Sequence, residues 1–285
     1  DDKMKNIVAT IQREQNQIIR NEDIRTLIIQ GVAGSGKTSI ALHRIAYLLY
    51  TFRDSISSKD ILIISPNKVF SDYISNVLPE LGEETVPETS MEQILSGVLE
   101  HKFFKWTDNP GMFKMRKGHT LEYSDLAPLA YLHLALEGNG NQPFRVKHLL
   151  IDEMQDYSPI QYKVIQKLFP CRKTVLGDAG QSVNPYGSST AETIQKSLTA
   201  SEIMKLCKSY RSTFEITDFA QKIHPNAELE PVARHGEKPQ ILQFGSAVEE
   251  LSGIMGLIST YRKSGYKSLG IICKTEQQAR KMADM

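Results

Sequence analysis

Short apolar runs alternate with amphipathic segments along most of the chain. Residues 26–30 and 60–65 are continuous apolar runs of strand length, whereas the apolar positions of residues 37–50 recur at helical spacing. The same alternation resumes near residue 148. Further strands are expected at 148–152, 173–177 and 201–206, and further helices at 7–19, 68–78, 158–168, 190–198 and 213–223. This order is typical of βαβ units, so we expect an α/β fold with a mainly parallel sheet flanked by helices.

A second alternation begins near Lys238. It follows a turn-rich stretch, 225–239, which has the composition of a linker. The pattern predicts strands at 239–244 and 268–273 and helices at 246–262 and 275–284. Two strand–helix pairs are few for an α/β domain, so we expect a fragment. The expected organisation is a first domain over 1–236, with a helical insertion at about 84–145, and the beginning of a second domain over 237–285.

Composition excludes several classes of protein. With 40% hydrophobic residues and a formal net charge of +1 in 285 residues, the chain has enough apolar material for a core and no global nucleic-acid signature. The three cysteines lie far apart and the seven histidines lack ligand spacing, so we expect neither disulfides nor structural zinc. No apolar run approaches the ~20 residues of a membrane span. The scattered, odd-numbered cysteines fit a reducing cytosol, so we expect a cytoplasmic protein. A local basic and aromatic stretch over 102–117 is either an exposed insertion or a nucleic-acid face.

The segment GVAGSGKT, from Gly31 to Thr38, fits the pattern of a phosphate-binding loop. Its context is the required one, because an expected strand precedes it and an expected helix follows it. Lys37 is expected to reach the β- and γ-phosphates of ATP, and the Thr38 hydroxyl to bind Mg²⁺. The loop backbone is expected to surround phosphate oxygens at Gly31, Gly34, Ser35 and Gly36.

The apolar run HLLI ends in a cluster of acids, DEMQD. On its own, this cluster is equally typical of a solvated turn. Beside a phosphate-binding loop, an acid at the end of a second strand is the expected ligand of the metal, and Asp152 has that position. Glu153 lies one residue further and is suited to activate water as a general base.

Together, the loop and the DEMQD box resemble a superfamily one helicase motor of the UvrD and Rep type, which implies a RecA-like domain. In IQREQNQII, the resemblance implies that Gln15 reads the adenine edge. In VLGDAGQSV, it implies that Gln181 touches the γ-phosphate and that Asp178 couples this contact to nucleic-acid binding. In CKSYRST, it implies that Tyr210 stacks on adenine and Arg211 reaches the γ-phosphate. The expected catalytic side chains are therefore Glu153, Lys37, Arg211 and Gln181.

Other segments are similar to the HelD-type branch, whose members act on bacterial RNA polymerase. These segments are ISPNKVFSDYISNVLPELGE, LEYSDLAPLAYLHLAL and DEMQDYSPIQ. Where UvrD-type proteins usually have an aromatic residue for base stacking, this chain has Ser65, Pro66 and Asn67. Compared with that branch, the insertion is short and the fifth and sixth motifs are absent. We therefore expect slow turnover by this piece.

Three functions follow from these patterns. The first is an ATP-driven motor that remodels RNA polymerase in the bacterial cytosol. The second is a UvrD-like DNA helicase that binds single-stranded DNA and unwinds duplex DNA, and the third is a protein-binding module switched by nucleotide. Glu153 favours hydrolysis over a pure switch. A small-molecule kinase fits less well, because Gln155 and Asp156 follow the acids.

Overall fold

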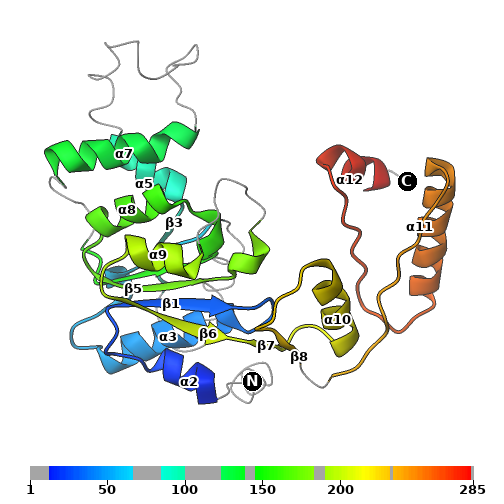
Figure 1. The fold of residues 1–285 in the computed structure, drawn as a ribbon, viewed down its shortest axis with the longest axis horizontal. Coiled ribbons are helices and arrows are strands. Elements are labelled where there is room, and N and C mark those ends of the chain that lie inside the picture. The colour runs from blue at the N-terminus through cyan, green and yellow to red at the C-terminus, as the bar shows by residue number, and fades with distance from the viewer. Residues whose placement is uncertain are drawn as a thin grey trace, which may run out of the picture. The chain divides into compact units, whose positions relative to one another are not determined.

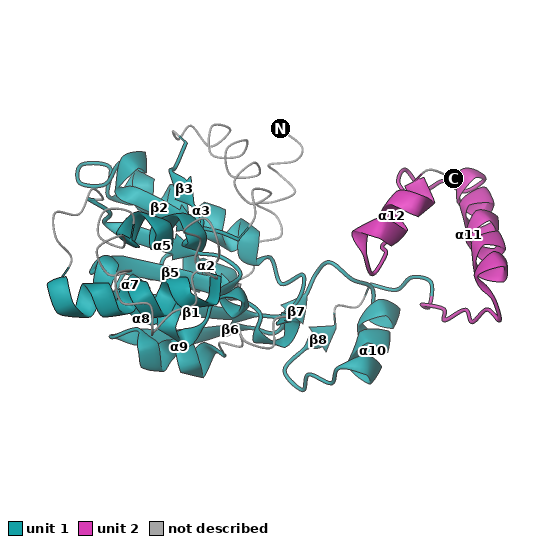
Figure 2. Cartoon of the chain, turned by 90° about the horizontal axis from the view of Figure 1, so that it is seen from above, with its two compact units in different colours: residues 1–237 teal, residues 238–285 magenta. Residues whose placement is uncertain are grey.

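The computed structural model describes residues 13–66, 85–99, 123–138, 145–182, 190–231 and 234–283. The chain divides into two compact units, Asp1–Glu237 and Lys238–Met285, which Figure 2 shows in different colours. Several predicted features lie outside the described residues. They are the first part of the helix expected at 7–19, the helix expected at 68–78, Asn67, and the basic and aromatic stretch 102–117.

A six-stranded sheet forms the centre of the first unit, in the order β3-β2-β4-β5-β1-β6. Every neighbouring pair of strands runs parallel. In the register of these pairs, Ile28 of β1 lies opposite Val175 of β5, and Leu150 of β4 lies opposite Thr174 of β5. The predicted α/β fold is thereby confirmed. The strands are β1 (Thr26–Gly31), β2 (Ile61–Ile64), β3 (Glu88–Thr89), β4 (His148–Ile151), β5 (Arg172–Gly177) and β6 (Ser201–Leu206).

Helices cover both faces of this sheet (Figure 1). One face packs against α2 (Arg13–Ile19) and α3 (Lys37–Thr51). The opposite face packs against α5 (Met91–Leu99), α7 (Tyr123–Glu137), α8 (Pro159–Leu168) and α9 (Ala191–Ser197). Because successive side chains of a strand point to opposite faces, Leu27 and Ile29 belong to the first core and Ile28 to the second. Burial on both faces explains why β1, β2 and β4 consist largely of apolar residues.

Smaller elements complete the first unit. Strands β7 (Lys208–Ser209) and β8 (Glu230–Pro231) form a separate parallel pair beside α10 (Phe214–Ile223). Among the described residues, short 3₁₀ turns lie in the connections at η1 (Ser58–Asp60), η2 (Met154–Asp156) and η3 (Ala179–Gln181). The sequence pattern did not predict β3, β7 and β8, because two residues are too short for a periodic signal.

In the second unit, the predicted helices form and the predicted strands do not. The helices are α11 (Ala247–Arg262) and α12 (Glu276–Ala283). Residues 239–244 and 268–273 are not strands, and Ile241 and Ile272 are 73% and 98% exposed. An apolar run becomes a strand only where a neighbouring strand accepts its backbone hydrogen bonds. Within the described part of this unit neither run has such a neighbour, so the strand prediction was wrong.

None of the described helices combines the length and the apolar character needed to cross a membrane.

A buried arginine joins α2 to the rest of the first unit. Arg44 of α3 is 2% exposed. Its guanidinium donates to the carbonyl oxygens of Ile18 (2.7 Å) and Ile19 (3.0 Å) in the last turn of α2, and to that of Asn21 (2.8 Å). It also donates to the hydroxyl of Thr174 in β5 at 2.9 Å. Burial lowers the pKa of Arg44 to about 10, so the group stays charged at neutral pH and fits the negative end of the α2 dipole.

We expect Arg44→Met to lower the free energy of unfolding by about 3 kcal/mol, because four acceptors, three of them buried, lose a charged donor while most of the side-chain volume remains. Chemical denaturation measures this change. Arg53→Met, at an exposed site close to the end of the same helix, is the matched control and is expected to change stability by less than about 0.5 kcal/mol. Equal effects of the two variants would contradict the anchoring role of Arg44.

Candidate nucleotide-binding site

The loop between β1 and α3 has the shape of a phosphate cradle. Gly34 and Gly36 have φ angles of 74° and 85°, in the left-handed region that glycine adopts most easily. The Ser35 amide donates to the Val32 carbonyl at 3.1 Å, which closes the turn. A Cβ added at Gly34 would lie 2.5 Å from the Cβ of Arg211, so a side chain at this position would clash as well as strain the backbone. The loop therefore depends on the glycines that the motif supplies.

Lys37 begins α3 and lies at the centre of a group of charges. Its ammonium donates to the carbonyl oxygens of Gly31 (2.9 Å) and Val32 (3.3 Å). Burial lowers the pKa of Lys37, while the carboxylates of Asp178, Glu153 and Asp152 raise it. These acids follow two different strands, so the fold brings them to the lysine of the loop. Because the carboxyl ends of parallel strands meet at one edge of the sheet, this is the edge where ligands bind in open α/β folds.

Asp152 directly follows β4 and is 7% exposed. Its amide donates to the Ile64 carbonyl of the neighbouring β2 at 2.9 Å, which keeps this backbone beside the sheet. Burial and the adjacent Glu153 raise the pKa of Asp152 to about 7, and Lys37 opposes this shift. A carboxylate that is costly to ionise in the folded protein is suited to a cation that binds with the nucleotide.

The backbone turns sharply at Glu153. This residue has φ 50° and ψ 54°, a left-handed conformation that is uncommon for a residue with a side chain. The Gln155 amide group donates to the Glu153 carboxylate at 2.8 Å and accepts from the Asp178 amide at 3.0 Å. One neutral side chain thus holds the predicted base and joins it to the end of β5. A Cβ added at Gly177 would lie 2.5 Å from the Met154 nitrogen, so only glycine permits this approach.

The carboxylate of Asp178 organises the turn that carries Gln181. It accepts from the Gly180 amide at 3.0 Å and from the exposed Gln181 side chain at 2.8 Å. It also accepts from the side chain of Gln30 at 3.0 Å. The motif analysis did not select Gln30, although a polar residue near the end of an otherwise apolar strand was a visible signal.

The other predicted residues also adjoin the loop. The side chain of Gln15 is 7% exposed and donates to the Ser35 carbonyl at 3.2 Å. The Tyr210 amide donates to the Gly34 carbonyl at 2.9 Å, which brings the segment after β7 to the cradle. Arg211 is exposed beside Gly34, and Thr38 is half-buried as the second residue of α3. The predicted residues therefore lie together around the loop between β1 and α3. Their roles in binding a nucleotide remain predictions.

The donor set fits ATP with Mg²⁺. Mg²⁺ is commonly bound by one or two protein groups together with phosphate oxygens, and Thr38 and Asp152 are the predicted pair of protein ligands. Among the described residues no group of three or more histidines, cysteines or acids could hold a metal ion. A metal at this edge would accordingly depend on the phosphates for much of its coordination.

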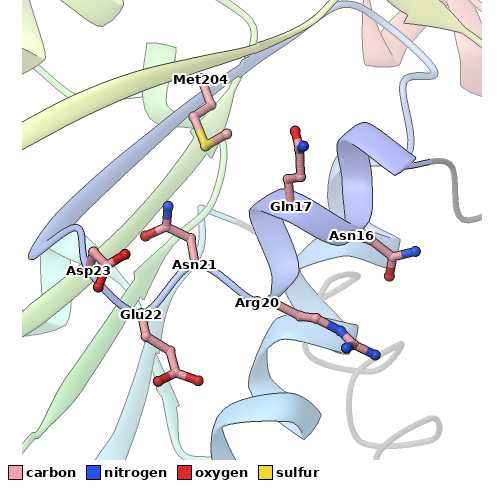
Figure 3. Close-up of a pocket in the computed structure, with 7 residues that line it drawn as sticks. All are labelled: Asn16, Gln17, Arg20, Asn21, Glu22, Asp23 and Met204. Atoms are coloured by element: carbon pink, nitrogen blue, oxygen red, sulfur yellow. The ribbon is translucent and has the colours of Figure 1, made fainter.

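A separate open groove of about 860 Å³ runs beside α2 and the edge strand β6 (Figure 3). Arg20 lies there with Glu22 and Asp23, so the charges are mixed. It lacks the glycine cradle of the loop, and neither Gln15 nor Lys37 lines it. The lining residues are Asn16, Gln17, Arg20, Asn21, Glu22, Asp23 and Met204.

Comparison with known families agrees with this geometry. A family model described as "AAA domain" matches residues 15–187, more than half of the chain. The chain belongs to this AAA domain family. The match begins at Gln15 and includes the phosphate-binding loop, the acids after β4 and Gln181.

The relatives to which the chain is similar are described as helicases. The ATP-dependent DNA helicase PcrA of Staphylococcus epidermidis is 22% identical over 97% of the chain and 49% of its own length. DNA helicase II of Haemophilus influenzae is 38% identical over 29% of the chain and 12% of its own length. A crystal structure of Bacteroides sp Pif1 in complex with ADP-AlF4 has a TM-score of 0.40 at 15% identity, covering 95% of the chain and 55% of Pif1. The chain spans about half or less of the length of these curated relatives.

The pKa of Asp152 leads to a pH-dependent prediction. The folded protein binds this proton more tightly than the unfolded chain, in which the pKa is about 3.8, so stability falls as pH rises from about 4 to about 7. Asparagine does not titrate. Without divalent cations, we expect Asp152→Asn to be more stable than the unaltered protein by about 2–4 kcal/mol at pH ~8, and by much less at pH ~4.5.

Urea denaturation at the two pH values measures this difference. The exposed Asp54→Asn is the matched control and is expected to show no such dependence. A stability gain of Asp152→Asn that is the same at both pH values would show that the carboxylate is not held in a costly environment.

Proposed function

We propose that this chain is the ATP-binding portion of a superfamily one DNA helicase motor. The observation that carries the proposal is the convergence of Lys37 with Asp152, Glu153 and Asp178 at a glycine cradle. Phosphoryl transfer needs little more from a protein than positioning and charge neutralisation, and these groups supply both.

Each side chain has a defined task in this proposal. The loop and Lys37 hold the phosphates, and Thr38 with Asp152 would hold Mg²⁺, whose charge would offset that of the phosphates. Glu153, fixed by its hydrogen bond from Gln155, orients and deprotonates the attacking water.

The nucleotide would be recognised at both of its ends. Gln181 and Arg211 contact the γ-phosphate, for which the planar guanidinium of an arginine is well suited. Gln15 and Tyr210 hold the adenine. Residues 1–236 would then be the first RecA-like domain, and 237–285 the beginning of a second.

DNA is the favoured substrate. PcrA and DNA helicase II are described as DNA helicases, and these relatives support the UvrD-like alternative better than a HelD-like factor that remodels RNA polymerase. The remaining support for RNA polymerase is the resemblance of short segments such as Ser65-Pro66-Asn67 and the residues after Asp156. We therefore propose single-stranded DNA as the partner, with RNA polymerase as the competing one.

Nucleotide binding is tested on the chain itself. ATP with Mg²⁺ is expected to raise the melting temperature by several degrees, since a ligand that binds only the folded state stabilises it. Lys37→Ala is expected to abolish this shift, because the phosphates lose their cation. Lys59→Ala, at an exposed site, is expected to retain it. A full shift in Lys37→Ala would mean that the nucleotide binds elsewhere.

The partner is tested by ATP turnover of the whole protein, with single-stranded DNA and RNA polymerase as separate stimulators. We expect DNA to stimulate turnover by about tenfold or more, and Glu153→Gln to abolish turnover while keeping nucleotide binding. Stimulation by RNA polymerase alone would favour the HelD-like function. Nucleotide binding with no turnover under either condition would favour the protein-binding switch.

A further inference from the structure

Gln30 is the residue of β1 immediately before the first glycine of the cradle. In the β1–β5 pairing it lies opposite Gly177, the last residue of β5. Its side chain makes two hydrogen bonds to the segment that follows β5. The amide nitrogen donates to Oδ1 of Asp178 at 3.0 Å, and the amide oxygen accepts from the Ala179 nitrogen at 3.2 Å.

The two bonds match the chemistry of a carboxamide. Asp178 presents an acceptor and Ala179 presents a donor, and a glutamine has one group of each kind in a single plane. A carboxylate at position 30 would keep the bond from Ala179 but place a second negative charge against Asp178. An aliphatic side chain would make neither bond. The position therefore selects a neutral group with a donor and an acceptor.

These bonds connect two parts of the candidate site. Gln30 is joined through the backbone to Gly31, whose carbonyl accepts from the Lys37 ammonium. Asp178 in turn fixes the side chain of Gln181 at 2.8 Å and is the largest of the carboxylate influences that raise the pKa of Lys37. A movement of the turn relative to the cradle would break both Gln30 bonds.

We propose that Gln30 is a positioning residue that holds the turn of Asp178 and Gln181 in register with the phosphate cradle, and so sets the preference for a nucleotide with a γ-phosphate. The inference rests on the proposed function, in which Gln181 meets the γ-phosphate. ADP has no γ-phosphate for Gln181 to contact, so its binding depends mainly on the cradle and Lys37.

The experiment measures the dissociation constants of ADP and of a non-hydrolysable ATP analogue, both with Mg²⁺, for the chain and its variants. For Gln30→Ala we expect the analogue to bind roughly three- to tenfold more weakly, the range expected for the loss of one or two hydrogen bonds. ADP binding is expected to stay within about twofold. General loosening of the fold would weaken the binding of both nucleotides. A change in the ratio of the two dissociation constants therefore reports the positioning role.

Two further variants make the test decisive. Gln30→Glu keeps the size of the side chain but places a charge beside Asp178. It is expected to lose discrimination between the ATP analogue and ADP at least as strongly as Gln30→Ala. If the alanine variant does not fold, this variant provides the test. Gln195→Ala removes an exposed glutamine that donates to the Ser201 carbonyl, and is expected to leave both constants unchanged.

Failure of this inference and failure of the proposed function give different results. Unchanged discrimination in both Gln30 variants, or an equal loss for both nucleotides, would overturn the positioning role while leaving the nucleotide site intact. Failure of the unaltered chain to bind either nucleotide would overturn the proposed function and this inference with it.

Discussion

The site depends on keeping several carboxylates close to one lysine at a largely buried edge of the sheet. Burial lowers the pKa of Lys37 and nearby Arg211 adds to this, while Asp178, Glu153 and Asp152 act in the opposite direction. The same burial raises the pKa of Asp152 to about 7. Charges held in this way are costly without a counter-ion, and a magnesium nucleotide would supply both a cation for the acids and an anion for the lysine.

Neutral groups hold these charges in place. The amides of Gln155 and Gln30 bridge the strand ends, and Gly177 lets the segments approach closely enough for those bonds to form. The charged Arg44 is also held by neutral partners, since three backbone carbonyls and one hydroxyl accept its four hydrogen bonds. Neutral partners set geometry without cancelling charge, so the acids remain available for a ligand.

The confirmed predictions are those in which local pattern and packing agree. Strands β1, β2 and β4 consist largely of apolar residues because helices cover both faces of the sheet, and the cradle is recognisable because its glycines and lysine lie within one short stretch of sequence. The strand prediction failed at 239–244 and 268–273, where equally apolar runs have no neighbouring strand among the described residues of their unit. Gln30 was missed because its partners, Asp178 and Ala179, are almost 150 residues away.

The sequence by itself determined the α/β class, the phosphate-binding loop and the identity of the acids, because each is encoded by neighbouring residues of the right type and spacing. Only the tertiary structure decided which of them meet. The parallel sheet brings the ends of β1, β4 and β5 to one edge, where Gln155 and Gln30 join acids from separate segments to the cradle. Those contacts span long stretches of chain, and their geometry arises only when the strands pair in order.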